Sequence, residues 1–315
     1  MRDDLDLEHA IAESVDRSIP FIDAHHHIWD LSRWPYRWIR DEVKPDGSIA
    51  PVTDATAVLG EYKILRQTWT MERLQRDFYG SNVIGTVHIE ADCNADDPVE
   101  ETVWLEETAE RVGMPNAFVV YADVTKPGVG RQLERHLEAS GRVRGLRPRT
   151  HPPAWETPAF REAMTALGAL GLSYEISTSP GLLLNARDAA CAFPATAMVL
   201  GHTGLPVQRD RAYFEQWRSE MRALAEAPNV TCKVSGLGMF DHGWSVDSIT
   251  PWVLGAIDAF GPDRIMFATN WPVDLVFSSY LRQVDAWRWV IARAGFSREE
   301  QEAMLYRNAQ RIYRI

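Results

Sequence analysis

Lysine and cysteine are scarce in this sequence. Lysine occupies four of the 315 positions and cysteine three, and the formal net charge is −11. A strongly acidic chain is a poor partner for nucleic acids and for anionic membrane surfaces, so we expect neither. The cysteines are scattered, odd in number and without metal-binding spacing, which favours packed, reduced thiols over a disulfide framework. Their positions are Cys93, Cys191 and Cys232.

Long apolar runs and nucleotide-binding loops are also missing. No run approaches the roughly 20 apolar residues of a membrane-spanning helix, and the acidic start lacks the apolar core of a secretory signal. No GxGxxG, GxxxxGKS or GxxxxGKT pattern follows an apolar stretch, which disfavours a nucleotide as ligand. We expect a cytoplasmic protein with a small-molecule substrate. Its size and tryptophan content are compatible with a homodimer.

The stretch PFIDAHHHIWD at residues 20–30 is the most informative part of the sequence. It begins as a short apolar strand and then places three histidines where the strand should end. Since side chains alternate along a strand, His25 and His27 are expected on one side and His26 on the other. Two imidazoles side by side form half of a metal site or of a proton-transfer site. A polar strand end with satisfied hydrogen bonds is the alternative.

Apolar strand patterns alternate with amphipathic helix patterns along the rest of the chain. The expected strands are 82–92, 117–124, 143–150, 172–178, 195–204, 229–238 and 264–274. The expected helices are 70–80, 98–113, 129–141, 157–171, 181–193, 211–227, 247–261, 279–295 and 297–313. Such alternation indicates a parallel sheet, and about eight βα units without a linker favour a (β/α)8 TIM barrel over an open doubly wound sheet.

We expect residues 1–315 to form one barrel domain of the α/β class, with room for distortion from the ideal barrel. Residues 1–18 resemble a polar leader. Residues 31–63 form a long loop after the first strand, and its aromatic and charged residues suit a lid over a polar ligand. Residues 297–315 contain a C-terminal helix.

Polar and charged residues gather where the predicted strands end. In a barrel of this kind the carboxyl ends of the strands meet at one face, which carries the active site. Glu175 and Lys233 can instead pair as structural charges inside the barrel, and Arg147 can cap a loop. The convergence of so many polar and charged residues at one face of the barrel favours a functional site. The residues are His25, His27, His88, Glu90, Arg147, Glu175, His202, Lys233, Asn270, Trp271 and Asp274.

A set of motifs in order resembles the amidohydrolase superfamily, in its lactonase-like branch of TIM-barrel metal-dependent hydrolases. The motifs are DAHHHIWD, VRGLRP, LGHTGLP, NVTCKVSGLG and RIMFATNWPVD, followed by the tail MLYRNAQRIYRI. The resemblance runs from residue 20 to the end. It implies the barrel fold and hydrolysis of a polar or acidic lactone, such as one from sugar acids or aromatic degradation. Some members look metal-free, and some bind a single divalent ion.

The last motif departs from the family pattern. There the eighth strand usually ends in Ser-Asp-Trp-Pro, whose Asp takes a proton from the attacking water and binds the metal where there is one. This chain has Asn270, and an amide is neither a general base nor a strong metal ligand. Asp274, Glu90 or a neutral histidine can take over, and Glu90, expected beside His88, is the favoured replacement. Asp274 can instead cap the following helix.

The resemblance also bears on metals. Two-metal members carry a bridging carboxylated lysine on the fourth strand, but residues 143–150 contain no lysine, so we expect no binuclear site. One zinc or manganese ion held by His25, His27 and His202, with an open position for water, is one hypothesis. The other is metal-free catalysis, in which the histidines and the planar fork of Arg147 bind a carboxylate or carbonyl.

The leading functional hypothesis is hydrolysis of a cyclic ester. An activated water attacks the lactone carbonyl, and the metal, or imidazolium with Arg147, stabilises the oxyanion. His202 orients the water or protonates the leaving alkoxide. An isomerase or decarboxylase of a carboxylated substrate is an alternative because Asn270 replaces the carboxylate, and a degenerate ligand-binding barrel is another. The residues expected to contact the substrate are His88, Arg147, Glu175 and Trp271.

Overall fold

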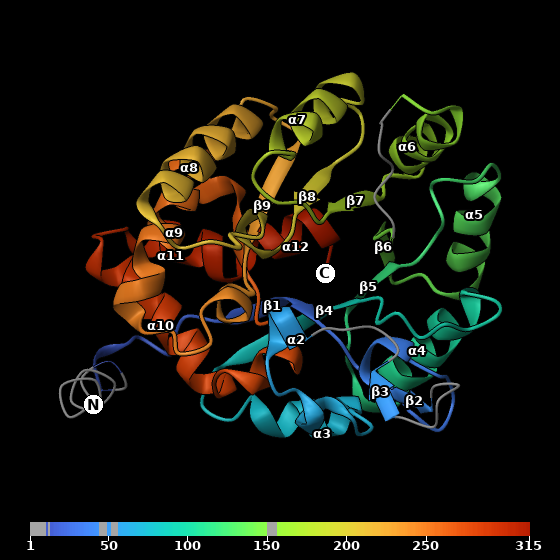
Figure 1. Ribbon diagram of the computed structural model, residues 1–315, viewed down its shortest axis with the longest axis horizontal. Helices are drawn as coiled ribbons and strands as arrows, with labels where there is room; N and C mark the ends of the chain where they lie inside the picture. The colour runs from blue at the N-terminus through green and yellow to red at the C-terminus, as the bar shows by residue number, and fades with distance from the viewer. Residues whose placement is uncertain (1–10, 12, 44–48, 52–55, 150–155) are drawn as a thin grey trace.

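Eight parallel strands form the centre of the molecule and curve into a nearly closed barrel (Figure 1). The computed structural model describes residues 11, 13–43, 49–51, 56–149 and 156–315. The strands follow one another around the sheet in chain order. The predicted (β/α)8 TIM barrel is confirmed. The strands are β1 (Phe21–His26), β4 (Val83–Ile89), β5 (Ala117–Val120), β6 (Val143–Leu146), β7 (Ser173–Ile176), β8 (Met198–Leu200), β9 (Val230–Val234) and β10 (Ile265–Phe267).

Helices follow the strands and surround the barrel (Figure 1). The chain ends in α11 (Arg298–Glu302), a π-helical turn (Ala303–Arg307) and α12 (Asn308–Tyr313), so the helix expected over 297–313 is divided into three segments. The surrounding helices are α3 (Met71–Asp77), α4 (Val99–Val112), α5 (Val129–Ala139), α6 (Pro158–Leu170), α7 (Leu183–Ala192), α8 (Arg211–Ala225), α9 (Val246–Phe260) and α10 (Tyr280–Arg293).

Local sequence signals set the helix ends. Thr157 begins α6 by accepting the backbone N–H of Phe160, and a proline follows it in the first turn. Ser279 begins α10 by accepting the backbone N–H of Arg282. Ser279, and not Asp274, is therefore the N-cap of the helix after the last strand.

The seam between the last and first strands is closed by residues at the strand ends. The backbone N–H of His27 donates to the carbonyl of Trp271 at 2.7 Å, and that of Asn270 donates to the carbonyl of His25 at 2.8 Å. The same short stretches therefore close the barrel and carry several of the predicted site residues.

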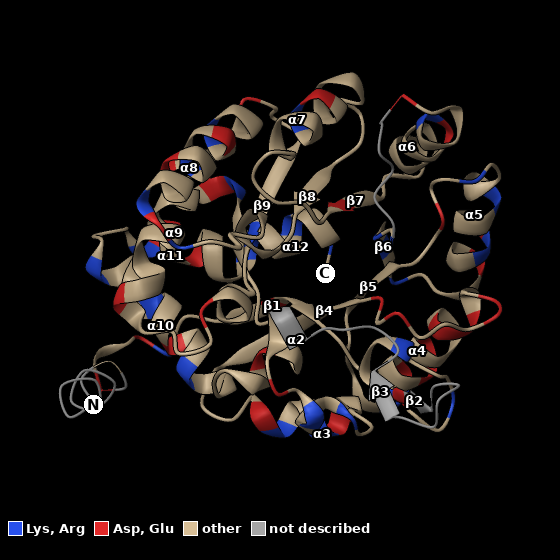
Figure 2. Ribbon diagram, viewed as in Figure 1, with Lys and Arg blue, Asp and Glu red and all other residues tan. Residues whose placement is uncertain are grey.

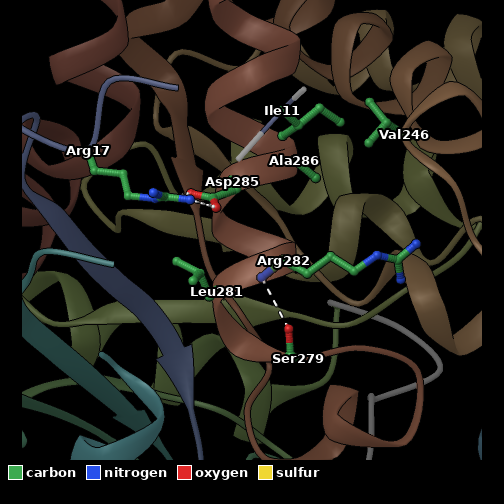
Figure 3. Close-up of a pocket in the computed structure, with 8 residues that line it drawn as sticks. All are labelled: Ile11, Arg17, Val246, Ser279, Leu281, Arg282, Asp285 and Ala286. Atoms are coloured by element: carbon green, nitrogen blue, oxygen red, sulfur yellow. Dashed lines mark hydrogen bonds and ion pairs between the residues drawn. The ribbon is translucent and has the colours of Figure 1, made fainter. Parts of the chain in front are cut away.

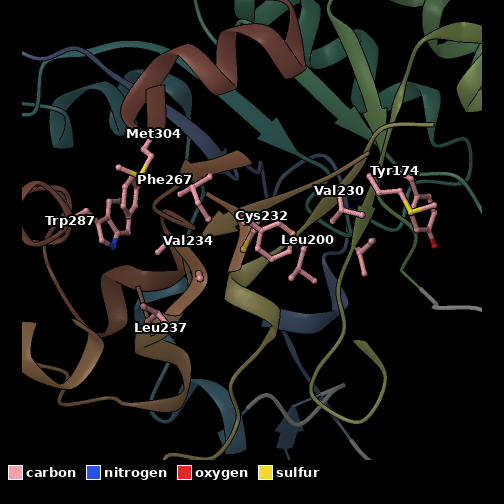
Figure 4. Packing of buried hydrophobic residues seen from close by; sticks show 14 of the residues in the cluster. Tyr174, Leu200, Val230, Cys232, Val234, Leu237, Phe267, Trp287 and Met304 are labelled. Carbon is pink, nitrogen blue, oxygen red and sulfur yellow. The ribbon is translucent and has the colours of Figure 1, made fainter. Parts of the chain in front are cut away.

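Two apolar layers hold the barrel together. Inside it, Ile22, Val87 and Ile89 pack with Ala309 and Tyr313 of α12. The other face of the strands packs against the helices, and burial of this apolar surface is the main favourable term in folding. Figure 4 shows part of that outer layer, which includes Leu200, Val230, Cys232, Phe267 and Trp287.

The sixth barrel strand is shorter than predicted. It was expected over 195–204, but β8 ends at Leu200 and a 3-10 turn, His202–Gly204, follows. His202 and Thr203 have φ values of 49° and 56°. A left-handed backbone cannot continue a strand, so His202 extends from a turn beyond the strand.

The long segment after β1 has secondary structure of its own. Residues 44–48 and 52–55 of the expected lid, and most of the expected leader 1–18, lie outside the described residues. Ile39 and Leu59 are buried with Trp29 in an apolar cluster next to the barrel. The elements of the segment are a 3-10 turn (Arg37–Ile39), the antiparallel strands β2 (Asp41–Val43) and β3 (Ile49–Pro51), and α2 (Thr56–Leu59).

Charged residues of both signs are spread over the outer helices (Figure 2). Within the described part of the chain, every helix is too short or too polar to span a bilayer.

Candidate active site

An irregularity in β1 sets the direction of its three histidines. Between Asp23 and His26 the pairing with β4 shifts, and β1 carries one residue more than its neighbour. A bulge of this kind re-aims side chains at a strand end. His25 and His27 face each other with their Nε2 atoms 3.2 Å apart. His26 turns to the other side, where its ring lies 5.7 Å from that of His88.

The hydrogen bonds of His25 and His27 indicate their tautomers. Nδ1 of His27 donates to the carbonyl of Ile89 at 2.7 Å, which leaves its Nε2 to accept from Nε2–H of His25. Nδ1 of His25 is buried and has no hydrogen-bond partner among the described residues. Burial, reinforced by neighbouring positive charge, lowers the pKa of both rings well below the ordinary value. Both imidazoles are therefore neutral at physiological pH.

His202 reaches the same place from the turn after β8. Its ring centroid lies 4.6 Å from that of His25, and its Nδ1 is 3.1 Å from the hydroxyl of Ser235. Burial lowers the pKa of His202 to about 3, and the positive charges of Arg147 and Lys233 add to the effect. The ring is a neutral donor or acceptor and not an imidazolium.

Asn270 stands at the end of β10 with a left-handed backbone, φ 57°. Its Nδ2 donates to Oδ1 of Asp274 at 2.8 Å, and Nε2 of Gln283 donates to the other oxygen, Oδ2, at 2.9 Å. Burial raises the pKa of Asp274 to about 7, despite these two hydrogen bonds. Asp274 is thus a buried carboxyl group that titrates near neutral pH directly behind Asn270.

Glu90, at the end of β4, is bound by two arginines. Its Oε1 accepts from Nε of Arg147 at 2.8 Å, and its Oε2 accepts from Nε of Arg149 at 2.8 Å. Burial alone raises the pKa of Glu90, but Arg147 and Arg149 outweigh it and hold the pKa below its ordinary value. Nη1 of Arg147 donates no hydrogen bond to a described residue. That nitrogen is available to a ligand.

Four of these residues, His27, Arg147, His202 and Asn270, border a cavity of about 330 Å³ at the carboxyl ends of the strands. Its polar lining comes mainly from strand ends, and most of its apolar lining comes from the loops beyond them. Of the predicted lid, Trp38, Val58 and Leu59 reach the cavity. The polar lining residues are His27, Asp92, Arg147, His202 and Asn270, and the remaining apolar ones are Ala91, Met239 and Val273.

Three residues expected to contact the substrate lie away from this cavity. Glu175 forms the predicted buried pair with Lys233, 2.9 Å from its Nζ. The indole N–H of Trp271 donates to Asp77 of α3 at 2.8 Å. His88 is fully buried and accepts the backbone N–H of the residue after His27 at 3.3 Å. These three side chains therefore make contacts within the fold and do not line the cavity.

The structure adds residues that the sequence reasoning did not select. Asp92 lines the cavity, and its position two residues after Glu90 is a signal that strand alternation could have given. Ser235 pairs here with His202. The sequence places it with Lys233 among the polar residues at the end of the seventh strand but gives it no role. Met239 and Gln283 lie in or next to the site with no preceding polar strand pattern to mark them.

The histidines form half of a metal site. Two nitrogens bound to one tetrahedral zinc at 2.0–2.1 Å would lie about 3.3 Å apart, close to the spacing of the His25 and His27 Nε2 atoms. Across the residues that the structure describes, however, no group of three or more His, Cys, Asp or Glu side chains could hold a metal ion. The set His25, His27 and His202 is therefore not assembled as a three-ligand site, and Asn270 supplies no carboxylate to complete it.

A second cavity, of about 250 Å³, lies between the segment before β1 and the helices α9 and α10 (Figure 3). On its wall, Nη2 of Arg17 lies 2.6 Å from Oδ2 of Asp285. None of the predicted site residues lines this cavity. The first cavity is the candidate active site.

Comparison with known sequences shows the family of the chain. The sequence model of the amidohydrolase family matches residues 22–315. The chain belongs to the amidohydrolase family. This amidohydrolase is 36% identical to an uncharacterized Sinorhizobium fredii protein, y4mH, over 94% of its own chain and 99% of the relative. It is 26% identical to an L-fucono-1,5-lactonase of Burkholderia multivorans, over 93% of its chain and 96% of the relative.

Solved structures share the fold of this amidohydrolase. A zinc-bound amidohydrolase from Burkholderia multivorans superimposes with a TM-score of 0.76 at 24% identity, over 94% of this chain and 99% of the other. The 5-carboxyvanillate decarboxylase of Sphingomonas paucimobilis superimposes with a TM-score of 0.59 at 16% identity, over 94% and 99% of the two chains.

Proposed function

We propose that the protein is a hydrolase that opens a small lactone in the cavity at the carboxyl ends of the strands. The observation that carries the proposal is the polar floor of that cavity. There, neutral His27 and His202 lie with the cationic Arg147 and the amide of Asn270. Transfer of an acyl group to water needs donors for the developing oxyanion and groups that orient the water. These four side chains supply both.

The cavity limits the class of substrate. A volume near 330 Å³ is at the small end of the range for ligand sites, about 300–1,000 Å³, so it suits one ring with few substituents. Nη1 of Arg147 fits a carbonyl or a carboxylate oxygen. Leu59, Met239 and Val273 suit a part of the ring without hydroxyl groups. A polar or acidic monocyclic lactone meets all three conditions, and the lactonase relatives support the same class.

We assign separate roles to Arg147 and His202. Arg147 is held by Glu90 through Nε and Nη2, so its remaining nitrogen, Nη1, can bind the carbonyl oxygen or a carboxylate of the substrate. Ser235 can donate its hydroxyl hydrogen to Nδ1 of His202, which leaves Nε2–H as a donor to the leaving ring oxygen. Both groups strengthen their contacts as negative charge develops on oxygen.

A lactone panel with a pH indicator tests the proposal. The wild-type protein should acidify weakly buffered medium with at least one polar or acidic lactone and yield the ring-opened acid. Arg147→Lys keeps the charge but loses the planar fork, so kcat/KM should fall about tenfold or more. Arg144→Lys on the same strand, where the guanidinium contacts backbone carbonyls, is the matched control. Failure of the wild-type protein to open any lactone would contradict the proposal.

We infer that this hydrolysis does not need a bound metal. The support is the ligand set, in which two imidazoles converge but neither a third ligand nor a carboxylate from the described part of the chain joins them. Dialysis against a chelator should leave the rate of lactone opening unchanged within about twofold. Loss of activity that one equivalent of zinc or manganese restores would overturn the inference and favour metal-assisted hydrolysis.

Decarboxylation of a carboxylated ring is the competing function. Two observations favour it, namely Asn270 in place of a carboxylate and the likeness in fold to a decarboxylase. The same cavity would then bind the carboxylate through Arg147. Release of carbon dioxide from aromatic acids, without ring opening of any lactone, would select this function over the hydrolase.

A further inference from the structure

Asp274 lies behind Asn270, and its hydrogen-bond partners bear on the chemistry of the site. Asp274 is buried, and its two oxygens accept hydrogen bonds from two amides, Nδ2 of Asn270 and Nε2 of Gln283. No described lysine, arginine or histidine forms an ion pair with Asp274. Because the Asn270 nitrogen is directed to Asp274, its oxygen is the end of the amide left for the cavity that Asn270 lines. Among the described residues, no hydrogen bond reaches that oxygen.

The two buried carboxylates of the site have opposite environments. Glu90 is bound by two arginines, which stabilise its charged form and make it a weak proton acceptor. Asp274 has uncharged partners, and its pKa near 7 matches that of an efficient base at neutral pH. Carboxylates whose environments separate their pKa values in this way commonly divide the acid and base roles of a site. Glu90, favoured as base from the sequence, is thus the less suited of the two.

We propose that Asn270 and Asp274 act together as a two-residue proton relay that replaces the single carboxylate of the related enzymes. The inference rests on the proposed lactone hydrolysis. Asn270 contacts the attacking water through Oδ1, and Asp274 is the terminal proton acceptor, acting through Asn270. Gln283 is a positioning residue that holds the second carboxylate oxygen.

The relay balances without any further reactant. The water oxygen forms a bond to the lactone carbonyl carbon, and a water proton moves to Oδ1 of Asn270 while a proton on Nδ2 moves to Oδ1 of Asp274. Asn270 is then an imidic acid and Asp274 a neutral carboxyl group. When the ring C–O bond breaks, the proton on Oδ1 of Asn270 goes to the leaving ring oxygen, and Asp274 returns its proton to Nδ2. The carboxylic acid product finally loses its own proton to solvent.

The groups that face Asp274 do not provide a shorter route. Gln283 on α10 is an amide, and Asp23 on β1 is a second carboxyl group that disfavours charge on Asp274. Asp23 is itself occupied, because it accepts from the backbone and hydroxyl of Thr269 and from the hydroxyl of Tyr280. Asn270 is therefore the polar link from Asp274 to the cavity among the described residues.

Exchange of the two side chains tests the relay. Asp274→Asn removes the acceptor at nearly constant volume, and kcat should fall about 100-fold or more with little change in KM. The swapped variant Asn270→Asp/Asp274→Asn keeps the charge and the hydrogen bond but places the carboxylate at the cavity. It should recover activity to within about tenfold of wild type. Asp285→Asn, on α10 and away from the cavity, is the control and should leave kcat unchanged.

A proton inventory in mixtures of light and heavy water separates a relay from a structural role. Two exchangeable protons move in the wild-type step, so the inventory should be curved, whereas the swapped variant moves one and should give a straight line. A straight line for wild type overturns the relay, even if Asp274→Asn is inactive. So does an inactive swapped variant whose circular dichroism and melting temperature match those of wild type.

The outcome also distinguishes the relay from the proposed function. A wild-type protein that opens no lactone removes the hydrolase proposal, and the relay falls with it. A wild-type lactonase whose Asp274→Asn variant retains kcat within about threefold removes the relay alone.

Discussion

Asp274 combines burial with uncharged partners, and this has an energetic cost at the scale of one residue. Its pKa in the folded protein is about 7, against an ordinary value of 3.8. The folded state therefore holds this proton more tightly than the unfolded chain does. The contribution of Asp274 to stability is greatest below pH 4 and is lost as the pH rises from about 4 to about 7.

Asp274→Asn should remove this pH dependence. The free energy of unfolding of the variant, relative to wild type, should rise by up to about 4 kcal/mol between pH 4 and pH 8, at about 1.36 kcal/mol per pKa unit. Urea unfolding at the two pH values measures the difference. Asp285→Asn, whose carboxylate is paired with Arg17, should show no such rise. Equal pH dependence in wild type and Asp274→Asn would show that Asp274 has an ordinary pKa.

The sequence predicts the position of a single side chain only where strand alternation determines its direction. His25 and His27 follow an apolar strand two residues apart, and strand alternation predicts that they lie on one side and His26 on the other. The partnership of Asn270 and Asp274 depends on the left-handed φ of Asn270, which no pattern marks. The sequence also could not show that Arg149 reaches Glu90, because the two residues follow β6 and β4, which are separated by β5 in the sheet.

Turns beyond the strands determine the site at the scale of elements. His202 is held by Ser235 at the end of β9, and Gly236 follows with φ 63°. A Cβ at Gly236 would lie 2.8 Å from Nδ1 of His202 and 2.6 Å from Cε of Met239. The close approach of this backbone to the imidazole therefore requires glycine.

Gly236→Ala should displace His202 and strain the turn. We expect a loss of about 1–3 kcal/mol in the free energy of unfolding, together with lower kcat/KM for lactone opening. Gly243→Ala is the control, because its Cβ would meet no atom of the described residues within 4 Å. Thermal unfolding and steady-state kinetics of both variants provide the comparison, and a fully active, fully stable Gly236→Ala protein would contradict it.

The order of the strands and helices could be predicted from the sequence, but the residues at which they end could be predicted less accurately. Apolar strands and amphipathic helices alternate clearly enough to predict the barrel. The strand expected over 195–204 was too long. The residues His202–Gly204 follow the apolar strand directly in sequence, but their backbone forms a 3-10 turn that the sequence pattern does not show. The C-terminal helix was expected to be continuous because its apolar spacing does not reveal the π-helical turn at Ala303–Arg307.

An ion pair in the barrel interior links distant parts of the whole molecule. Lys233 of β9 lies 3.0 and 2.9 Å from the two carboxylate oxygens of Glu175 of β7, and the hydroxyl of Tyr313 in α12 donates to the same carboxylate at 2.6 Å. Lys233 and Glu175 are almost fully buried. Each charge therefore depends on the other, since an unpaired charge in the interior is very unfavourable.

Lys233→Met should destabilise the protein by about 3–5 kcal/mol, because it leaves the Glu175 carboxylate buried without its cation. The double variant Lys233→Met/Glu175→Gln removes both charges and should recover much of that loss. Arg222→Met, which breaks an exposed pair with Asp258, should change stability by about 1 kcal/mol or less. Urea unfolding of these three variants, of the single variant Glu175→Gln and of wild type measures the coupling between the two charges. Additive losses from Lys233→Met and Glu175→Gln would show that the two charges are not coupled.

The barrel seam has a consequence for the synthesis of the chain. Asp23 and Thr269, which are hydrogen-bonded behind His25 and Asn270, are 246 residues apart in sequence. A nascent chain that has not yet released β10 from the ribosome has its histidines but neither Asn270 nor Asp274 beside them. Chemistry at this site therefore requires synthesis of the final strand, and truncated products that lack it should be unable to act on substrate.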